Sequence, residues 1–254
     1  TRRSSDLSAV GRSADEVYTA CYDQLRAKSL EYYKRFPEDR VRLAELMALA
    51  EKGEITIPNG DIVTPSRLRS LGHLLGASGG AEKLHYLLEY PHTSRSFRHD
   101  LAGLLPFGGR NPLYAVIHES SYADGVVTDW SAARMLPEDF QQDPTLLTGE
   151  HVMPEWFDTD QELQPWKEVA NLIANHPWPK LYDADALRAA EVPCAAAVYH
   201  DDAYVPRQFS VETAALLPQM HAWVTTEYEH NGSNASGGAV LDRLIKLVKG
   251  ELVR

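Results

Sequence analysis

The last third of the chain contains an acidic pair and a histidine that each follow a strand-like run. The run that starts at Val198 leads into Asp201 and Asp202, and the run that starts at Ala222 ends in His230. Asp202 and His230 are 28 residues apart, which leaves room for a loop, a helix and one further strand. An acid and then a histidine, each just past a strand, form the second half of a Ser–Asp–His triad. Spacing alone leaves a turn aspartate and an exposed histidine equally open.

Two acids compete for this role, because Asp201 directly precedes Asp202. We favour Asp202, since it stands immediately before a loop that closes on Pro206. In such a pair the acid orients the imidazole, and the imidazole acts first as general base and then as general acid.

The serine that would complete a triad is not evident. Residues 76–80 read Gly-Ala-Ser-Gly-Gly and satisfy the G-x-S-x-G pattern around Ser78. That pattern marks a nucleophile only when a strand precedes it and a helix follows. Residues 67–75 have helical spacing and no β-branched run. We therefore interpret the motif as a glycine-rich link between two helices.

Two carboxylates stand in apolar or small-residue surroundings. Glu119 lies within a predicted helix, and Glu150 follows a strand-like stretch at 145–148. Burying a carboxylate is costly unless it meets a cation. A substrate ammonium group would supply one, but a salt bridge to Arg110 or Arg134 is the explanation that the residues alone favour.

The elements that must position these side chains fall into two groups. Roughly the first 180 residues are predicted to be mainly helical, and only the tail has a strand–helix–strand–helix pattern typical of a parallel sheet. The expected helices span 13–52, 65–75, 80–88, 111–122, 129–135 and 183–190, with a hairpin at 55–63. The expected tail elements are a strand at 195–200, a helix at 210–217, a strand at 221–228 and a helix at 239–249. Parallel sheets are covered on both faces and usually have more than two strands. The two strands expected here therefore predict that further strands, from a partner, complete the sheet.

Composition and net charge exclude several classes of partner and site. The chain has 254 residues, 44% of them hydrophobic, and a formal net charge of -11, which argues against nucleic acid and anionic membranes as partners. Its two cysteines make no disulfide framework, and its histidines show no metal-ligand spacing. No run of 18 apolar residues and no basic-then-apolar leader is present. We expect a cytoplasmic protein without a metal or other cofactor.

Six stretches together resemble the prolyl aminopeptidases (proline iminopeptidases), serine peptidases of the α/β-hydrolase fold. They are residues 11–18, 84–89, 111–119, 147–150, 195–206 and 223–232. The resemblance covers essentially the whole chain and is specific to this subfamily.

The resemblance implies that the chain is the C-terminal portion of an α/β-hydrolase. Residues 1–180 would form a helical cap domain, and residues 181–254 the last strands and helices of the parallel sheet. Asp202 and His230 fall where such enzymes carry the triad acid and histidine. Glu119, and by a weaker match Glu150, would bind the free α-amino group of an N-terminal proline.

These enzymes carry the nucleophile in a Gly-x-Ser-x-Gly-Gly elbow upstream of the cap. The serine is thus expected on an N-terminal fragment of the same enzyme, either a nicked segment or a separate chain. The implied reaction is metal-free acyl transfer that releases proline from peptides. Two alternatives stay open: another cap-bearing hydrolase such as an esterase or epoxide hydrolase, and a non-catalytic binding protein.

Overall fold

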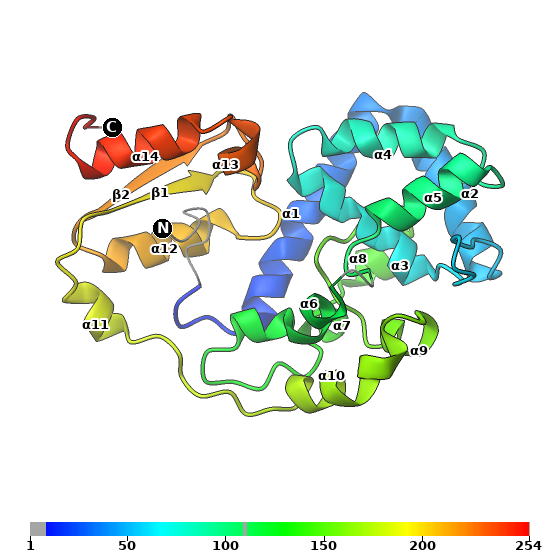
Figure 1. Cartoon of the computed structure of the whole chain (residues 1–254), viewed down its shortest axis with the longest axis horizontal. Coiled ribbons are helices and arrows are strands. Elements are labelled where there is room, and N and C mark those ends of the chain that lie inside the picture. Colours follow the sequence, from blue (N-terminus) through cyan, green and yellow to red (C-terminus); the bar gives the residue numbers. More distant parts are fainter. Residues whose placement is uncertain (1–8, 109–110, 254) are drawn as a thin grey trace.

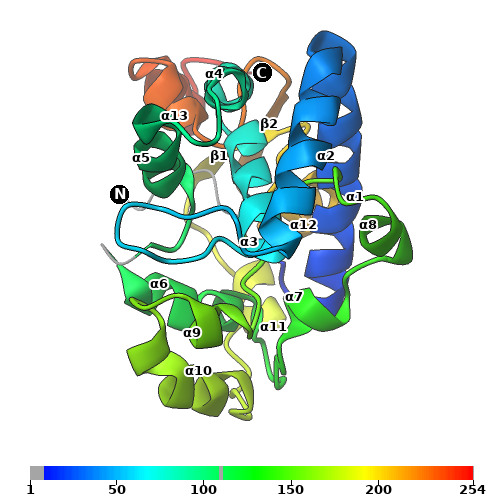
Figure 2. The ribbon, with the colours of Figure 1, turned by 90° about the vertical axis from the view of Figure 1, so that its right-hand side faces the viewer.

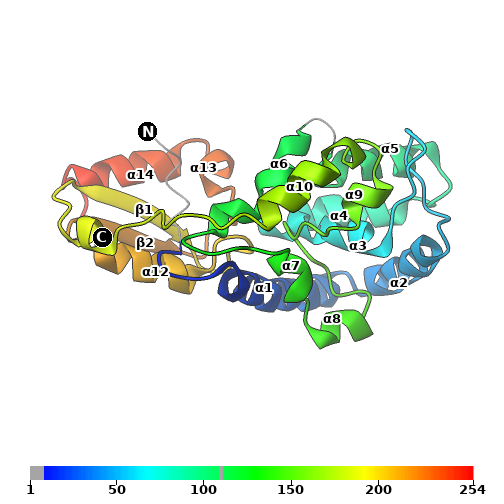
Figure 3. The ribbon, with the colours of Figure 1, turned by 90° about the horizontal axis from the view of Figure 1, so that it is seen from below.

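A computed structural model describes residues 9–108 and 111–253 and shows a small parallel sheet beside a larger helical body (Figure 1). The sheet consists of β1 (Cys194–Tyr199) and β2 (Met220–Thr225), which pair in parallel with Tyr199 opposite Thr225. The connecting helix α12 (Arg207–Leu216) covers one face, and α14 (Ala239–Val248) covers the other (Figure 3). The predicted strand–helix–strand–helix tail is therefore confirmed, with ends that agree to within three residues.

The sheet is held by one apolar face of α14. Val240, Leu244 and Leu247 repeat at the spacing of one helical face and pack on Ala197 and Tyr199 of β1. Within the described residues β1 and β2 pair only with each other.

Helix α1 (Ala14–Arg35) lies between the sheet and the rest of the helical body (Figure 1). Its start is fixed by a capping box. Ser13 Oγ accepts the Glu16 N–H at 3.2 Å, and the Glu16 carboxylate accepts the Ser13 N–H at 2.9 Å. On the sheet side, Cys21 of α1 packs with Phe209 of α12.

Among the described residues, the two largest apolar cores both lie in the helical body. The first is formed by the C-terminal half of α1 and the following helices: α2 (Pro37–Glu51), α3 (Pro65–Arg69), a 3-10 helix (Ser70–Gly76), α4 (Gly80–Glu89) and α5 (Arg95–Leu104). The second gathers around Trp156 and Phe157. Figure 2 shows α4 and α5 at one end of the body and α6, α9 and α10 at the other.

Short helices build the second core and the link to the sheet. They are α6 (Pro112–Ile117), a 3-10 helix (Glu119–Tyr122), α7 (Ser131–Arg134), α8 (Glu138–Gln142), α9 (Trp156–Thr159), a 3-10 helix (Gln164–Trp166), α10 (Lys167–Ala174) and α11 (Ala184–Arg188). A further short helix, α13 (Gly232–Ala235), follows the sheet. No helix in the two described ranges is both long and apolar enough to cross a membrane.

One predicted element is wrong. Residues 145–148 form no strand, because their backbone groups bind helices instead: the Thr148 N–H donates to the Arg69 carbonyl and the Leu147 N–H to Ser29 Oγ. The predicted link around Ser78 is confirmed, since a 3-10 helix precedes this turn and α4 follows it.

Candidate functional site

Asp202 and His230 meet at one edge of the sheet. Because β1 and β2 are parallel and in register, the segments that follow them leave at the same edge. Nδ1 of His230 lies 2.9 Å from Oδ2 of Asp202. The Asp202 side chain is 1% exposed and that of His230 is 29% exposed. This arrangement gives a buried carboxylate that orients a partly accessible imidazole, which is what proton transfer at a reacting group requires.

The backbone after β1 fixes the Asp202 carboxylate. Its Oδ1 accepts the N–H groups of Tyr204 and Val205 at 2.9 and 3.0 Å, which leaves Oδ2 for His230. The rival acid, Asp201, is exposed and bonds the neighbouring His200 at 2.8 Å. The structure thus brings Asp202, and not Asp201, to His230.

His230 lies on the wall of a cavity of about 370 Å³ between the helical body and the sheet. Aromatic and aliphatic side chains dominate this wall, with a few polar groups among them. The lining residues are Ala9, Val17, Tyr114, Ile117, His118, Ser120, Ser121, Tyr122, Asp124, Glu150, Tyr182, Tyr204, Val205, Pro206, Phe209 and His230. A largely apolar cavity with few polar groups is typical of a small-ligand or active site.

Glu150 lies on the same wall as His230. The hydroxyl of Tyr114 donates to Glu150 Oε2 at 3.0 Å. The buried His118 ring packs edge-on against Tyr114 at 5.1 Å between ring centres, and burial lowers the pKa of His118 below its usual value. Nε2 of His118 has no hydrogen-bond partner among the described residues. Because burial favours the neutral form of His118, this ring adds no positive charge beside the Glu150 carboxylate. The cavity therefore suits a cationic group.

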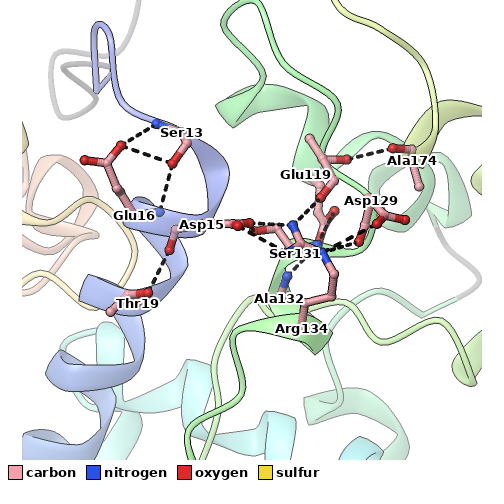
Figure 4. A network of polar contacts seen from close by, with 11 residues as sticks. Ser13, Asp15, Glu16, Thr19, Glu119, Asp129, Ser131, Ala132, Arg134 and Ala174 are labelled. Atoms are coloured by element: carbon pink, nitrogen blue, oxygen red, sulfur yellow. Dashed lines mark hydrogen bonds and ion pairs between the residues drawn. The ribbon is translucent and has the colours of Figure 1, made fainter.

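Glu119 is not part of the cavity wall. Its Oε1 accepts the Ala132 N–H at 2.8 Å and its Oε2 the Ser131 N–H at 3.1 Å, so the carboxylate binds the first turn of α7 (Figure 4). Burial raises the pKa of Glu119, although both N–H groups favour the ionised form. Ser131 and Arg134 also bond Asp15 of α1, which ties α7 to that helix.

Asp124 closes the cavity where three chain segments meet. Its carboxylate accepts the N–H groups of Gly11, Leu181 and Tyr182 at 3.4, 2.7 and 3.1 Å. Burial works against ionisation, but these donors outweigh it and hold the pKa of Asp124 below its usual value. The Asp124 carboxylate therefore fixes the segment that carries Tyr182 on the cavity wall.

Sequence reasoning missed Tyr204, Asp124 and the cavity position of His118. The stretch from Asp202 to Pro206 did signal a tight loop, but nothing in it indicated that the Tyr204 ring packs edge-on against the His230 ring at 4.9 Å. Nothing in the sequence around His118 indicated that its side chain would reach the cavity wall. Among the described residues, no group of three or more His, Cys, Asp or Glu side chains could hold a metal ion.

Comparison with known proteins finds similarity to two proline iminopeptidases. It is 38% identical over 251 residues to a proline iminopeptidase from Aeromonas sobria, a match covering 95% of this chain. It is 25% identical over 229 residues to one from Aspergillus aculeatus. The chain spans 59% and 51% of the lengths of these two relatives, and no protein-family model matches it. The predicted resemblance is thus confirmed: the chain is similar to a proline iminopeptidase along almost its whole length.

Proposed function

We propose that the chain is the helical cap and C-terminal part of an α/β-hydrolase that releases N-terminal proline from peptides. The observation that carries this proposal is one cavity wall that holds both His230, bonded to the buried Asp202, and the carboxylate of Glu150. A proton-transferring imidazole near a site for a cation fits a substrate that has a free, protonated amine beside its scissile bond.

The reaction is acyl transfer. A serine hydroxyl attacks the carbonyl of the N-terminal proline while His230 accepts the hydroxyl proton. His230 then gives the proton to the leaving amine, and Asp202 stabilises the imidazolium through Nδ1. Water repeats the sequence on the acyl-enzyme and releases free proline. Glu150 binds the α-ammonium group, which restricts the site to unblocked N-termini.

The nucleophile comes from polypeptide outside these 254 residues, either further sequence of the same protein or a second chain. Two serines on the cavity wall are unsuited, because Ser120 and Ser121 donate their hydroxyl protons to the carbonyls of Ile117 and His118. Ser78 lacks the preceding strand of a nucleophile elbow. A two-stranded parallel sheet also has room for the further strands that would carry such an elbow.

Fluorophosphonate labelling of the purified protein, followed by peptide mass spectrometry, locates the nucleophile. We expect the label on a serine outside residues 1–254, in polypeptide that copurifies with this chain. A label on Ser78, Ser120 or Ser121 would contradict this part of the proposal. No label at all, together with no hydrolysis, would favour a non-catalytic binding protein.

The charge of Glu150 is expected to select the free amine. The Glu150→Gln variant keeps the shape of the side chain but loses the attraction for an ammonium group, and a charged hydrogen bond contributes about 1.5–3 kcal/mol. We expect kcat/KM for proline p-nitroanilide to fall about 10- to 100-fold, mainly through KM. Steady-state kinetics on this substrate and on its N-acetylated form provide the measurement. A wild-type enzyme that is indifferent to the free amine would instead be an esterase or a related hydrolase.

Glu119→Gln is the matched comparison. The resemblance implies that Glu119 binds the substrate amine, and this contact stays a prediction. If Glu119 makes it, Glu119→Gln should raise KM as much as Glu150→Gln does. The contacts with Ser131 and Ala132 lead us to expect a lower melting temperature with KM nearly unchanged, because one N–H of α7 would face the amide NH₂ group.

A further inference from the structure

The turn Gly76–Gly80 touches the loop that carries His230. The N–H of His230 donates to the Gly76 carbonyl at 3.1 Å. The N–H of Ser78 donates to Oδ1 of Asn231 at 2.9 Å. The turn belongs to the helical body and the loop follows β2, so these bonds join the two parts of the molecule at His230 itself.

Tyr204 connects the same turn to both Asp202 and His230. Its backbone N–H donates to Asp202, its ring stands edge-on to the His230 ring at 88°, and its hydroxyl donates to the His73 carbonyl. The ring has room only because residue 76 is glycine: a Cβ on Gly76 would lie 2.4 Å from Cζ of Tyr204. Tyr204 is therefore confined between Gly76 and His230.

A third contact comes from α1. Nζ of Lys28 lies 2.6 Å from Oε2 of Glu229, the residue before His230, and the Lys28 side chain is only 11% exposed. Residues 229, 230 and 231 are thus each bonded to the helical body, by an ion pair, a backbone hydrogen bond and a side-chain hydrogen bond in turn.

We propose that the Gly76–Gly80 turn, with Tyr204 and Asn231, is a clamp that orients His230 toward Asp202. This inference rests on the proposed function for its catalytic meaning, because it assigns positioning residues to the same site. The turn acts through the Gly76 carbonyl, through the Ser78 N–H and through the absence of a side chain at Gly76. The Ser78 hydroxyl plays no part. The imidazole is correctly directed only while the helical body is docked on the sheet.

Asn231→Ala tests the clamp by removing the acceptor for the Ser78 N–H. Misplacement of a catalytic group by about 1 Å costs on the order of 100-fold in rate. We expect kcat for proline p-nitroanilide to fall about 10- to 100-fold, with KM within about twofold because Glu150 and the cavity wall are untouched. Asn231→Asp keeps an acceptor oxygen at the same place and should restore most of kcat.

Gly76→Ala is the second variant, since its methyl group displaces the Tyr204 ring toward His230. Gly103→Ala is its control: Gly103 lies in α5, and a Cβ there meets nothing within 4 Å. We expect Gly76→Ala to lose kcat at least as strongly as Asn231→Ala, and Gly103→Ala to keep it. Unchanged kcat in both Asn231→Ala and Gly76→Ala would overturn the clamp.

The proton NMR signal of the His230 Nδ1–H gives a readout that does not depend on turnover. A proton held between imidazole and carboxylate resonates far downfield, and we expect its loss in Asn231→Ala and its retention in Asn231→Asp and Gly103→Ala. A signal that persists in Asn231→Ala would speak against the clamp. Failure of the proposed function looks different: wild-type protein would show the signal but release no proline.

Discussion

The His230→Ala variant is expected to lose at least about 10⁴-fold in kcat on proline p-nitroanilide, with KM much less affected. In the proposed mechanism the imidazole removes the hydroxyl proton and later protonates the leaving amine, and removal of a triad member typically has this effect. Nδ1 of His230 is bonded to the buried Asp202, and the ring lies on the cavity wall. Steady-state kinetics of the protein together with its nucleophile-bearing segment provide the measurement.

His200→Ala is the matched control for this variant. His200 also follows a strand, but its side chain is exposed and bonds Asp201 rather than Asp202. We expect full activity from His200→Ala. Turnover close to that of the wild type in His230→Ala would remove His230 from the mechanism, whatever the outcome for His200.

The second large effect is expected at Asp202, where Asp202→Asn should lower kcat about 10⁴-fold. The N–H groups of Tyr204 and Val205 both donate to Oδ1, so the amide oxygen of an asparagine must stay there. The amide NH₂ group then faces Nδ1 of His230. That nitrogen can only accept, its proton moves to Nε2, and the imidazole cannot take a proton from serine.

Asp201→Asn provides the control, since it changes the charge by the same amount one residue away. Its carboxylate contacts His200 at the surface, so we expect little change in kcat. An equal loss of kcat in both variants would mean that the loss comes from the change in net charge and not from the contact with His230. A loss confined to Asp201→Asn would reverse the choice between the two acids.

The tail of the chain was predictable because its signals are local. Alternating apolar runs and turn residues marked β1, α12, β2 and α14 to within three residues. The contact between Asp202 and His230 did not follow from spacing, because it depends on the parallel register that sets Tyr199 opposite Thr225. The resemblance to a known family, rather than periodicity, singled out this pair.

The helical body was less predictable where backbone groups bind distant partners. The strand expected at 145–148 fails because its N–H groups find Arg69 and Ser29, which no local pattern reveals. Glu119 and Glu150 both stood out as acids in apolar surroundings, yet one binds the start of α7 and the other lines the cavity. That difference depends on where α7 packs, which neither residue's neighbours specify.

The contact of Ser78 with Asn231 joins residues 153 positions apart through a backbone N–H. Every residue except proline has a backbone N–H, so the residue type at position 78 does not indicate this contact. Only the three-dimensional arrangement could reveal the hydrogen bond. The glycine-rich motif was conspicuous for its serine, whereas its contacts come from Gly76 and from the N–H of residue 78.

The cavity wall draws on Ala9 near one end of the chain and on His230 near the other. The wall therefore needs both the helical body and the loop that follows β2. A local opening that separates these two parts would dismantle the cavity while the secondary structure of each part stays intact.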